Sequence, residues 1–239
     1  MGSFPSGKLI SLSGVDGAGK SLQAALLAEF FQREWDMRCT AVADVYPSKQ
    51  FRRADDLRSC FARLQSYDVV TTRFYLSSKW HYDLMMRVIY GSLGDPALGE
   101  RGIRTVARLA ERDRRLWDEY VLSPLLHAGK ILISDRYVFD EVAYRMIDYP
   151  NLAWLRGLFS GAPRPDLALL LRVTADTARE RNRHRSDAMT SIIRRTERLE
   201  SLISALDLVA EQYELTVLNA EKDSTTLAIE IHNQVRSAL

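Results

Sequence analysis

Short apolar runs alternate with amphipathic stretches along the 239-residue chain. The runs are rich in Leu, Ile and Val, and they lie at residues 8–13, 38–45, 130–134, 166–173 and 215–218. Apolar runs of this length are typical of parallel strands that are covered on both faces. Their alternation with helical patterns predicts an α/β fold of three layers, with a parallel five-stranded sheet flanked by helices.

Amphipathic stretches separate these runs and follow the last one. Their apolar residues recur three and four positions apart, which is the period of a helix packed on one face. They lie at residues 22–31, 51–65, 71–90, 103–126 and 225–236. Pro124 is expected to kink or end the fourth stretch. Because no repeat or linker divides the chain, we expect one domain over residues 1–239.

A glycine-rich segment follows the first run, and residues 14–21 are Gly-Val-Asp-Gly-Ala-Gly-Lys-Ser. This is the phosphate-loop pattern G-x-x-x-x-G-K-[ST], in the strand-to-helix position that the pattern requires. Backbone N–H groups and the helix N-terminus attract phosphate oxygens. Lys20 adds a mobile charge at the outer phosphates, and Ser21 offers a hydroxyl to Mg²⁺. The residues expected to bind ATP are Gly14, Gly17, Ala18, Gly19, Lys20, Ser21 and Leu22.

Composition and charge argue against several classes of protein. The formal net charge of +2 gives no reason to expect a nucleic-acid partner. No run approaches the roughly 18 apolar residues of a membrane span, and residues 1–7 lack the apolar core of a signal peptide. Cys39 and Cys60 fit neither a metal spacing nor a disulfide framework. We therefore expect a cytoplasmic protein without a membrane partner.

A second polar cluster ends the run at 130–134. Asp135 lies where a parallel strand would bring its carboxylate near the phosphate loop, so it is a candidate to hold Mg²⁺ directly or through water. The planar fork of Arg136 suits a phosphate dianion. The alternative is a capping carboxylate that pairs locally with a surface arginine.

These segments together resemble the thymidylate kinase family. The resemblance rests on residues 12–21, on residues 133–139 with Ala143-Tyr144, and on Pro-Asp-Leu at 165–167, which in that family opens the strand before a lid. It extends in order from about residue 8 to residue 218. It implies phosphate transfer from ATP, with Mg²⁺, to a nucleoside monophosphate such as dTMP. It also implies a homodimer formed through helices such as 71–90 and 103–126.

The resemblance assigns roles to individual residues. Asp16 looks like the residue that meets the sugar 3′-hydroxyl or the acceptor end, and Arg136 looks like the arginine that holds the acceptor phosphate. Tyr144 belongs to the same motif and is expected at the substrate. Around the second strand, Tyr46 and Lys49 match an aromatic residue and a position that is usually arginine.

Residues 74–80 resemble the helix that stacks an aromatic ring on the base. Tyr75 matches that ring, and Lys79 occupies the place of the base-reading arginine. Lysine keeps the charge but loses the bidentate fork, which leaves the base preference open. Asp140 and Glu141 also depart from the family, which has small residues there. They either narrow the acceptor pocket or face solvent at the start of a helix, where acidic residues are favoured.

The densest basic segment is the proposed lid at residues 179–189, which includes Arg181, Arg183 and Arg185. In nucleoside monophosphate kinases this place holds a mobile lid, and arginines there would neutralise the charge of the transferring phosphate. Because Gly17 stands where some family members carry a loop arginine, the resemblance implies that the lid supplies the catalytic one. The alternative is a solvated basic helix face.

The sequence thus favours an ATP-dependent nucleoside monophosphate kinase that phosphorylates dTMP without a covalent intermediate. One alternative is a kinase of a nucleoside or a modified nucleotide. Another, from a different class, is a nucleotide-binding regulator with little transfer activity. A GTPase switch is disfavoured because the chain has no N-K-x-D signature.

Overall fold

A computed structural model describes residues 7–45, 54–73, 96–183 and 196–239. Within them, six strands form one parallel sheet in the order β2-β3-β4-β1-β5-β6. The strands are β1 (Lys8–Ser13), β2 (Cys39–Ala41), β3 (Val69–Arg73), β4 (Ile131–Asp135), β5 (Leu167–Arg172) and β6 (Thr216–Asn219). The predicted α/β fold with a parallel sheet is confirmed, whereas the predicted number of five strands is wrong.

The additional strand is β3. Its residues, Val-Val-Thr-Thr-Arg, are mostly β-branched and favour a strand, but they run without a break into a segment with helical spacing. The prediction therefore began a helix at residue 71, inside β3. The rest of that expected helix lies outside the described residues. The expected strand 38–45 is also shorter, because Val42–Val45 forms a helical turn, α2.

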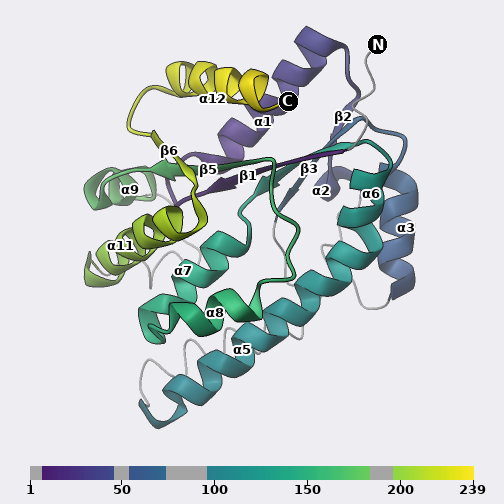
Figure 1. The fold of residues 1–239 in the computed structure, drawn as a ribbon. Coiled ribbons are helices and arrows are strands. Elements are labelled where there is room, and N and C mark those ends of the chain that lie inside the picture. Colours follow the sequence, from purple (N-terminus) through teal and green to yellow (C-terminus); the bar gives the residue numbers. More distant parts are fainter. Residues whose placement is uncertain (1–6, 46–53, 74–95, 184–195) are drawn as a thin grey trace.

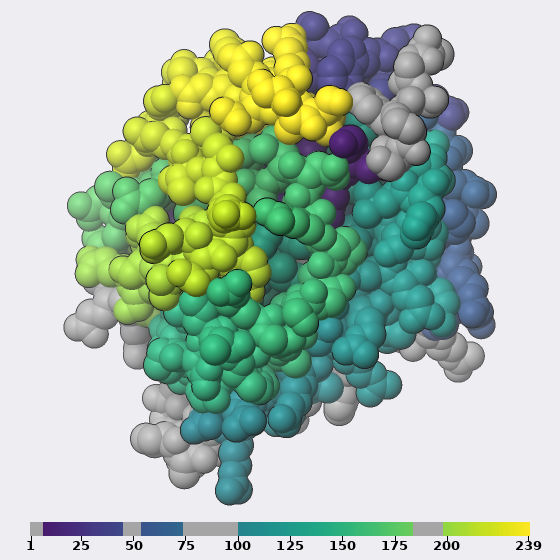
Figure 2. All heavy atoms as spheres, viewed as in Figure 1, coloured from purple at the N-terminus to yellow at the C-terminus, as the bar shows by residue number. Residues whose placement is uncertain are grey.

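Helices cover both faces of the sheet (Figure 1). α1 (Lys20–Trp35) and α12 (Ser224–Ala238) pack together on one face, and α7 (Val138–Asp148) and α11 (Thr196–Tyr213) pack together on the other. The described residues also form α3 (Ala54–Leu64), α5 (Pro96–Trp117), α6 (Ser123–His127), α8 (Leu152–Leu158) and α9 (Ala175–Arg181). Side chains of α8, α11 and α12 form much of the surface on the side shown in Figure 2.

The long helix expected at 103–126 is interrupted. α5 ends at Trp117, a π-helical turn covers Asp118–Leu122, and α6 begins at Ser123. Pro124 lies in the first turn of α6, where its missing N–H costs little. The helix thus changes from α to π geometry before the proline and continues to His127, so it does not end at Pro124.

The core lies along the central strands. All of β4 and all of β1 after Lys8 are buried, as expected for parallel strands covered on both faces. The register pairs Asp135 at the end of β4 with Leu12 of β1 and with Arg73 of β3. The carboxyl ends of these three strands therefore meet at one edge, which is where ligands bind in open α/β sheets.

Candidate active site

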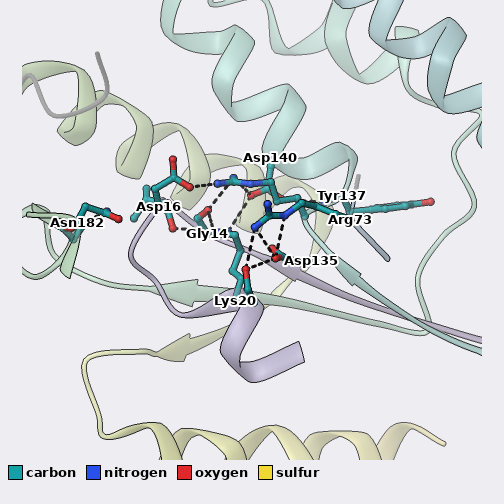
Figure 3. Close-up of polar contacts among 12 residues, drawn as sticks. Gly14, Asp16, Lys20, Arg73, Asp135, Tyr137, Asp140 and Asn182 are labelled. Carbon is teal, nitrogen blue, oxygen red and sulfur yellow. Dashed lines mark hydrogen bonds and ion pairs between the residues drawn. The ribbon is translucent and has the colours of Figure 1, made fainter. Parts of the chain in front are cut away.

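The glycine-rich loop joins β1 to α1 at this edge of the sheet (Figure 3). Gly14 and Gly17 have φ angles of 147° and 89°, which side chains disfavour. A Cβ atom on Gly14 would lie 2.6 Å from the carbonyl oxygen of Leu171, and one on Gly17 would lie 2.9 Å from that of Ala178. Since both obstacles are backbone atoms, only glycine lets the loop pack this closely against β5 and α9.

Lys20 is the first residue of α1, and its side chain lies beneath the loop. The residue is 5% exposed, and its ammonium donates to the carbonyl oxygens of Gly14 and Val15 at 2.8 and 2.9 Å. Burial is the main cause that lowers the pKa of Lys20 to about 8. The positive charge of Arg136 lowers it further, against the opposing effect of the carboxylates nearby. Phosphate oxygens would supply the anionic partner that this ammonium lacks.

Asp135 and Ser21 meet at the start of α1. The Ser21 hydroxyl donates to Asp135 Oδ2 at 2.5 Å. Asp135 is 4% exposed, and among the described residues its Oδ1 atom is buried without a hydrogen-bond partner. A buried carboxylate oxygen beside a hydroxyl fits a hydrated Mg²⁺ ion. The part of the chain that the structure describes has no group of three acidic, histidine or cysteine side chains for a metal, so such an ion would need phosphate oxygens as further ligands.

Arg73, at the end of β3, completes this contact and was not predicted from the sequence. Its Nη2 atom donates to Ser21 Oγ at 3.0 Å and to Asp135 Oδ2 at 3.2 Å, and its Nε atom lies 3.3 Å from the same carboxylate oxygen. The only sequence signal was an arginine at the end of a β-branched run. Its importance comes from the pairing of β3 with β4, which places it beside Asp135.

Arg136 follows β4 with a positive φ of 78° and lies between the carboxylates of Asp16 and Asp140. Its Nη2 atom pairs with Asp16 of the phosphate loop. Its Nη1 atom donates to Asp140 Oδ1 at 3.2 Å, and its guanidinium lies over the ring of Tyr144 at 5.6 Å. The structure thus brings together Asp16, Arg136, Asp140 and Tyr144, four residues that the sequence assigned to the acceptor.

Asp140 and Glu141 have different environments. Asp140 is 3% exposed, so the hypothesis that it faces solvent is wrong. Its carboxylate accepts hydrogen bonds from the backbone N–H groups of Gly14 and Tyr137, both at 3.1 Å. Glu141 is half-buried and instead accepts from Arg145 Nε at 2.6 Å, one turn further along α7. Only Asp140 contacts the loop.

The basic segment reaches the loop through Arg181, at the end of α9. Its Nη1 atom donates to the carbonyl oxygens of Gly17 at 3.2 Å and Ala220 at 2.9 Å. Arg183 is exposed and pairs with Glu180, while Arg185 lies outside the described residues. Outside them as well lie four predicted substrate contacts, which are Tyr46, Lys49, Tyr75 and Lys79.

A cavity of about 190 Å³ opens above the loop. Four cationic side chains and one carboxylate contribute to its lining; they are Lys20, Arg73, Arg136, Arg181 and Asp16. Leu22, Ser21, Gly17, Gly19 and Asn182 complete it. The excess of positive charge next to a loop of backbone N–H groups is suited to a polyphosphate.

The fold and this site define a class, the phosphate-loop nucleotide-binding proteins. Comparison with known proteins narrows the class, because the family model described as thymidylate kinase matches residues 101–231. This chain belongs to the thymidylate kinase family. The matched region contains Asp135, Arg136, Asp140 and Arg181.

Curated relatives agree with the family match. The chain is 28% identical over 236 residues to a probable thymidylate kinase of Thermococcus kodakarensis, covering 95% of this chain and 94% of the relative. It is 29% identical over 237 residues to a thymidylate kinase of Xanthomonas campestris, with coverage of 98% and 86%. A probable thymidylate kinase of Thermococcus onnurineus is 30% identical over 185 residues, with coverage of 74% and 72%. No helix in the described ranges is both long enough and apolar enough to span a membrane.

Proposed function

We propose that this protein is a thymidylate kinase that transfers the γ-phosphate of ATP to dTMP and forms dTDP. The observation that carries the proposal is the convergence of Lys20, Arg73, Arg136 and Arg181 on one cavity at the phosphate loop. Phosphoryl transfer demands little covalent chemistry from the protein, so positioning and charge neutralisation supply most of the catalysis. This cavity offers both.

The donor side is proposed to bind ATP with Mg²⁺. The loop N–H groups and the Lys20 ammonium would hold the phosphates, and Lys20 would exchange its two carbonyl partners for phosphate oxygens. Ser21 and Asp135 would hold Mg²⁺, which neutralises charge on the phosphates. With Asp135 engaged in this way, the guanidinium of Arg73 would be available to a phosphate.

The acceptor side is proposed to be formed by Arg136, Asp16 and Tyr144. A phosphate dianion matches the guanidinium fork of Arg136 better than a neutral hydroxyl does. Asp16, at 21% exposure the more accessible of the two carboxylates on Arg136, would give up its place and turn to the acceptor's sugar. Arg181 would stabilise the transferring group, where negative charge is greatest in the transition state.

A panel of acceptors tests the proposal. With ATP and Mg²⁺, dTMP should be phosphorylated, and thymidine should not, because it lacks the group that Arg136 recognises. The panel includes dUMP, dCMP and dGMP, since the side chains that would read the base lie outside the described residues. Use of thymidine with no use of any monophosphate would replace the proposal with a nucleoside kinase.

A homodimer is proposed with the activity. Its support is the family resemblance, which points to α5 and to the segment before it. Light scattering after size-exclusion chromatography tests it, and a single species with the mass of one 27.3 kDa chain across micromolar concentrations would contradict it.

A further inference from the structure

Asp140 connects the phosphate loop, Arg136 and the start of α7. Its Oδ1 atom accepts from Gly14 N–H of the phosphate loop at 3.1 Å and from Arg136 Nη1 at 3.2 Å. Its Oδ2 atom accepts from Tyr137 N–H at the start of α7, also at 3.1 Å. One buried carboxylate therefore holds the phosphate loop, Arg136 and the helix that follows β4 together.

The two carboxylates that pair with Arg136 differ in how deeply they are buried. The side chain of Asp140 is 4% exposed and that of Asp16 is 21% exposed. Among the described residues, two of the three donors to Asp140 are backbone N–H groups. Leaving those buried N–H groups without a partner would be costly, so Asp140 stays in place while Asp16 can be exchanged.

We propose that Asp140 is a positioning residue that holds Arg136 through Nη1, so that only Nη2 exchanges a carboxylate for the acceptor phosphate. The inference rests on the proposed function and deepens it, because it assigns a task to Asp140 within the acceptor site. In this arrangement Asp140 neither contacts the substrate nor repels it. Its charge instead sets the orientation of the guanidinium.

The test compares Asp140→Asn and Asp140→Ser with the control Glu141→Gln. Asparagine keeps one oxygen for Gly14 N–H and Arg136 Nη1, but it loses the negative charge that faces Arg136 and turns an amide NH₂ toward Tyr137 N–H. Serine is too short to span both Gly14 and Arg136. Both variants should raise the KM for dTMP at least tenfold while kcat changes less than about threefold, because phosphate binding is lost equally in the ground and transition states. The Asn variant should keep its KM for ATP within about threefold, and Glu141→Gln should match the parent in all three constants.

Equilibrium binding of dTMP in an Arg136→Ala background shows whether Asp140 acts through Arg136. There, Asp140→Asn should have no further effect on affinity. An equal loss in both backgrounds would overturn the inference, as would a KM for dTMP that stays at the parental value in a folded variant. Better use of dTMP by Asp140→Ser would instead mean that Asp140 obstructs the acceptor pocket.

Measurements on the parent protein distinguish a failure of this inference from a failure of the proposed function. If the parent phosphorylates dTMP and the Asp140 variants behave like it, the positioning role alone is wrong. If the parent neither binds nor phosphorylates any monophosphate, the proposed function fails and takes the inference with it. Thermal unfolding of each variant, measured alongside, identifies a change in turnover that comes only from loss of folded protein.

Discussion

Removal of the ion pair between Arg73 and Asp135 should measurably destabilise the nucleotide-free protein. Two guanidinium atoms lie 3.2 and 3.3 Å from one carboxylate oxygen. The carboxylate side chain is 6% exposed, whereas the arginine side chain is 45% exposed. A pair exposed on both sides contributes at most about 1 kcal/mol, and breaking a fully buried pair costs about 3–5 kcal/mol. Because solvent screens the arginine, we expect a coupling energy of about 1 kcal/mol. This value is at the upper end for an exposed pair and well below the cost of breaking a buried one.

A double-mutant cycle measures this coupling. Arg73→Ala, Asp135→Asn and the double variant are unfolded with urea at pH 7 without nucleotide, and the free energies of unfolding are combined. The matched control is the pair Arg164–Glu214, which has the same 3.2 Å separation from Nη2 to oxygen but is 83% and 80% exposed. Its coupling should stay below about 0.5 kcal/mol.

The two pairs share this Nη2-to-oxygen distance but differ in burial and in the further contacts of Arg73, whose Nε atom also reaches Asp135 and whose Nη2 atom also reaches Ser21. Equal coupling in the two pairs, or a smaller value for Arg73–Asp135, would refute the reasoning that the low exposure of Asp135 strengthens this contact. A change in the urea dependence of any variant would show that its denatured or native state had changed, and the uncharged substitution Arg73→Gln would then replace Ala in the cycle.

Three further predictions concern the loop and its surroundings. Lys20→Ala should reduce turnover by on the order of a hundredfold or more in folded protein, measured by steady-state kinetics, because a charge at the transferring phosphate is lost. Arg181→Ala should lower kcat and leave the affinity for ATP, measured by equilibrium binding, nearly unchanged. Arg183→Ala, at an exposed position, is the comparison variant. Hydrogen bonds, the strongest of them from the Thr174 hydroxyl, lower the pKa of Glu221 to about 2. The ionised Glu221 carboxylate therefore stabilises the fold fully above its ordinary pKa of 4.5, and this stabilisation is lost as the pH falls toward 2. Glu221→Gln should therefore have a lower melting temperature than the parent above pH 5, and this difference should shrink as the pH falls.

Local sequence was sufficient to predict the parts of the site that depend on short segments. The strand, glycine loop and helix around residues 14–21 are adjacent in sequence, and the φ angles at Gly14 and Gly17 explain why the motif needs glycine. Asp135 at the end of β4 was also predictable, since any parallel neighbour of β1 ends near the loop.

The contacts that were missed depend on long-range pairing. Arg73 is 62 residues from Asp135, and they meet only because β3 inserts between β2 and β4. The β-branched residues of Val69–Arg73 favour a strand, but no turn residue separates them from the helical pattern that follows. The environment of Asp140 was also undetermined, because an acidic residue in the first turn of a helix is stabilised in solvent and in a buried cap alike. Its bond to Gly14 joins segments 126 residues apart.

The acceptor measurement tests the central claim most directly. Initial rates with ATP and Mg²⁺ are compared for dTMP and thymidine, on the parent and on Arg136→Ala. The account predicts that the parent forms dTDP from dTMP, that thymidine is not used, and that Arg136→Ala loses most of its activity through a higher KM for dTMP. Formation of dTMP from thymidine by the parent, or unchanged use of dTMP by folded Arg136→Ala, would contradict it.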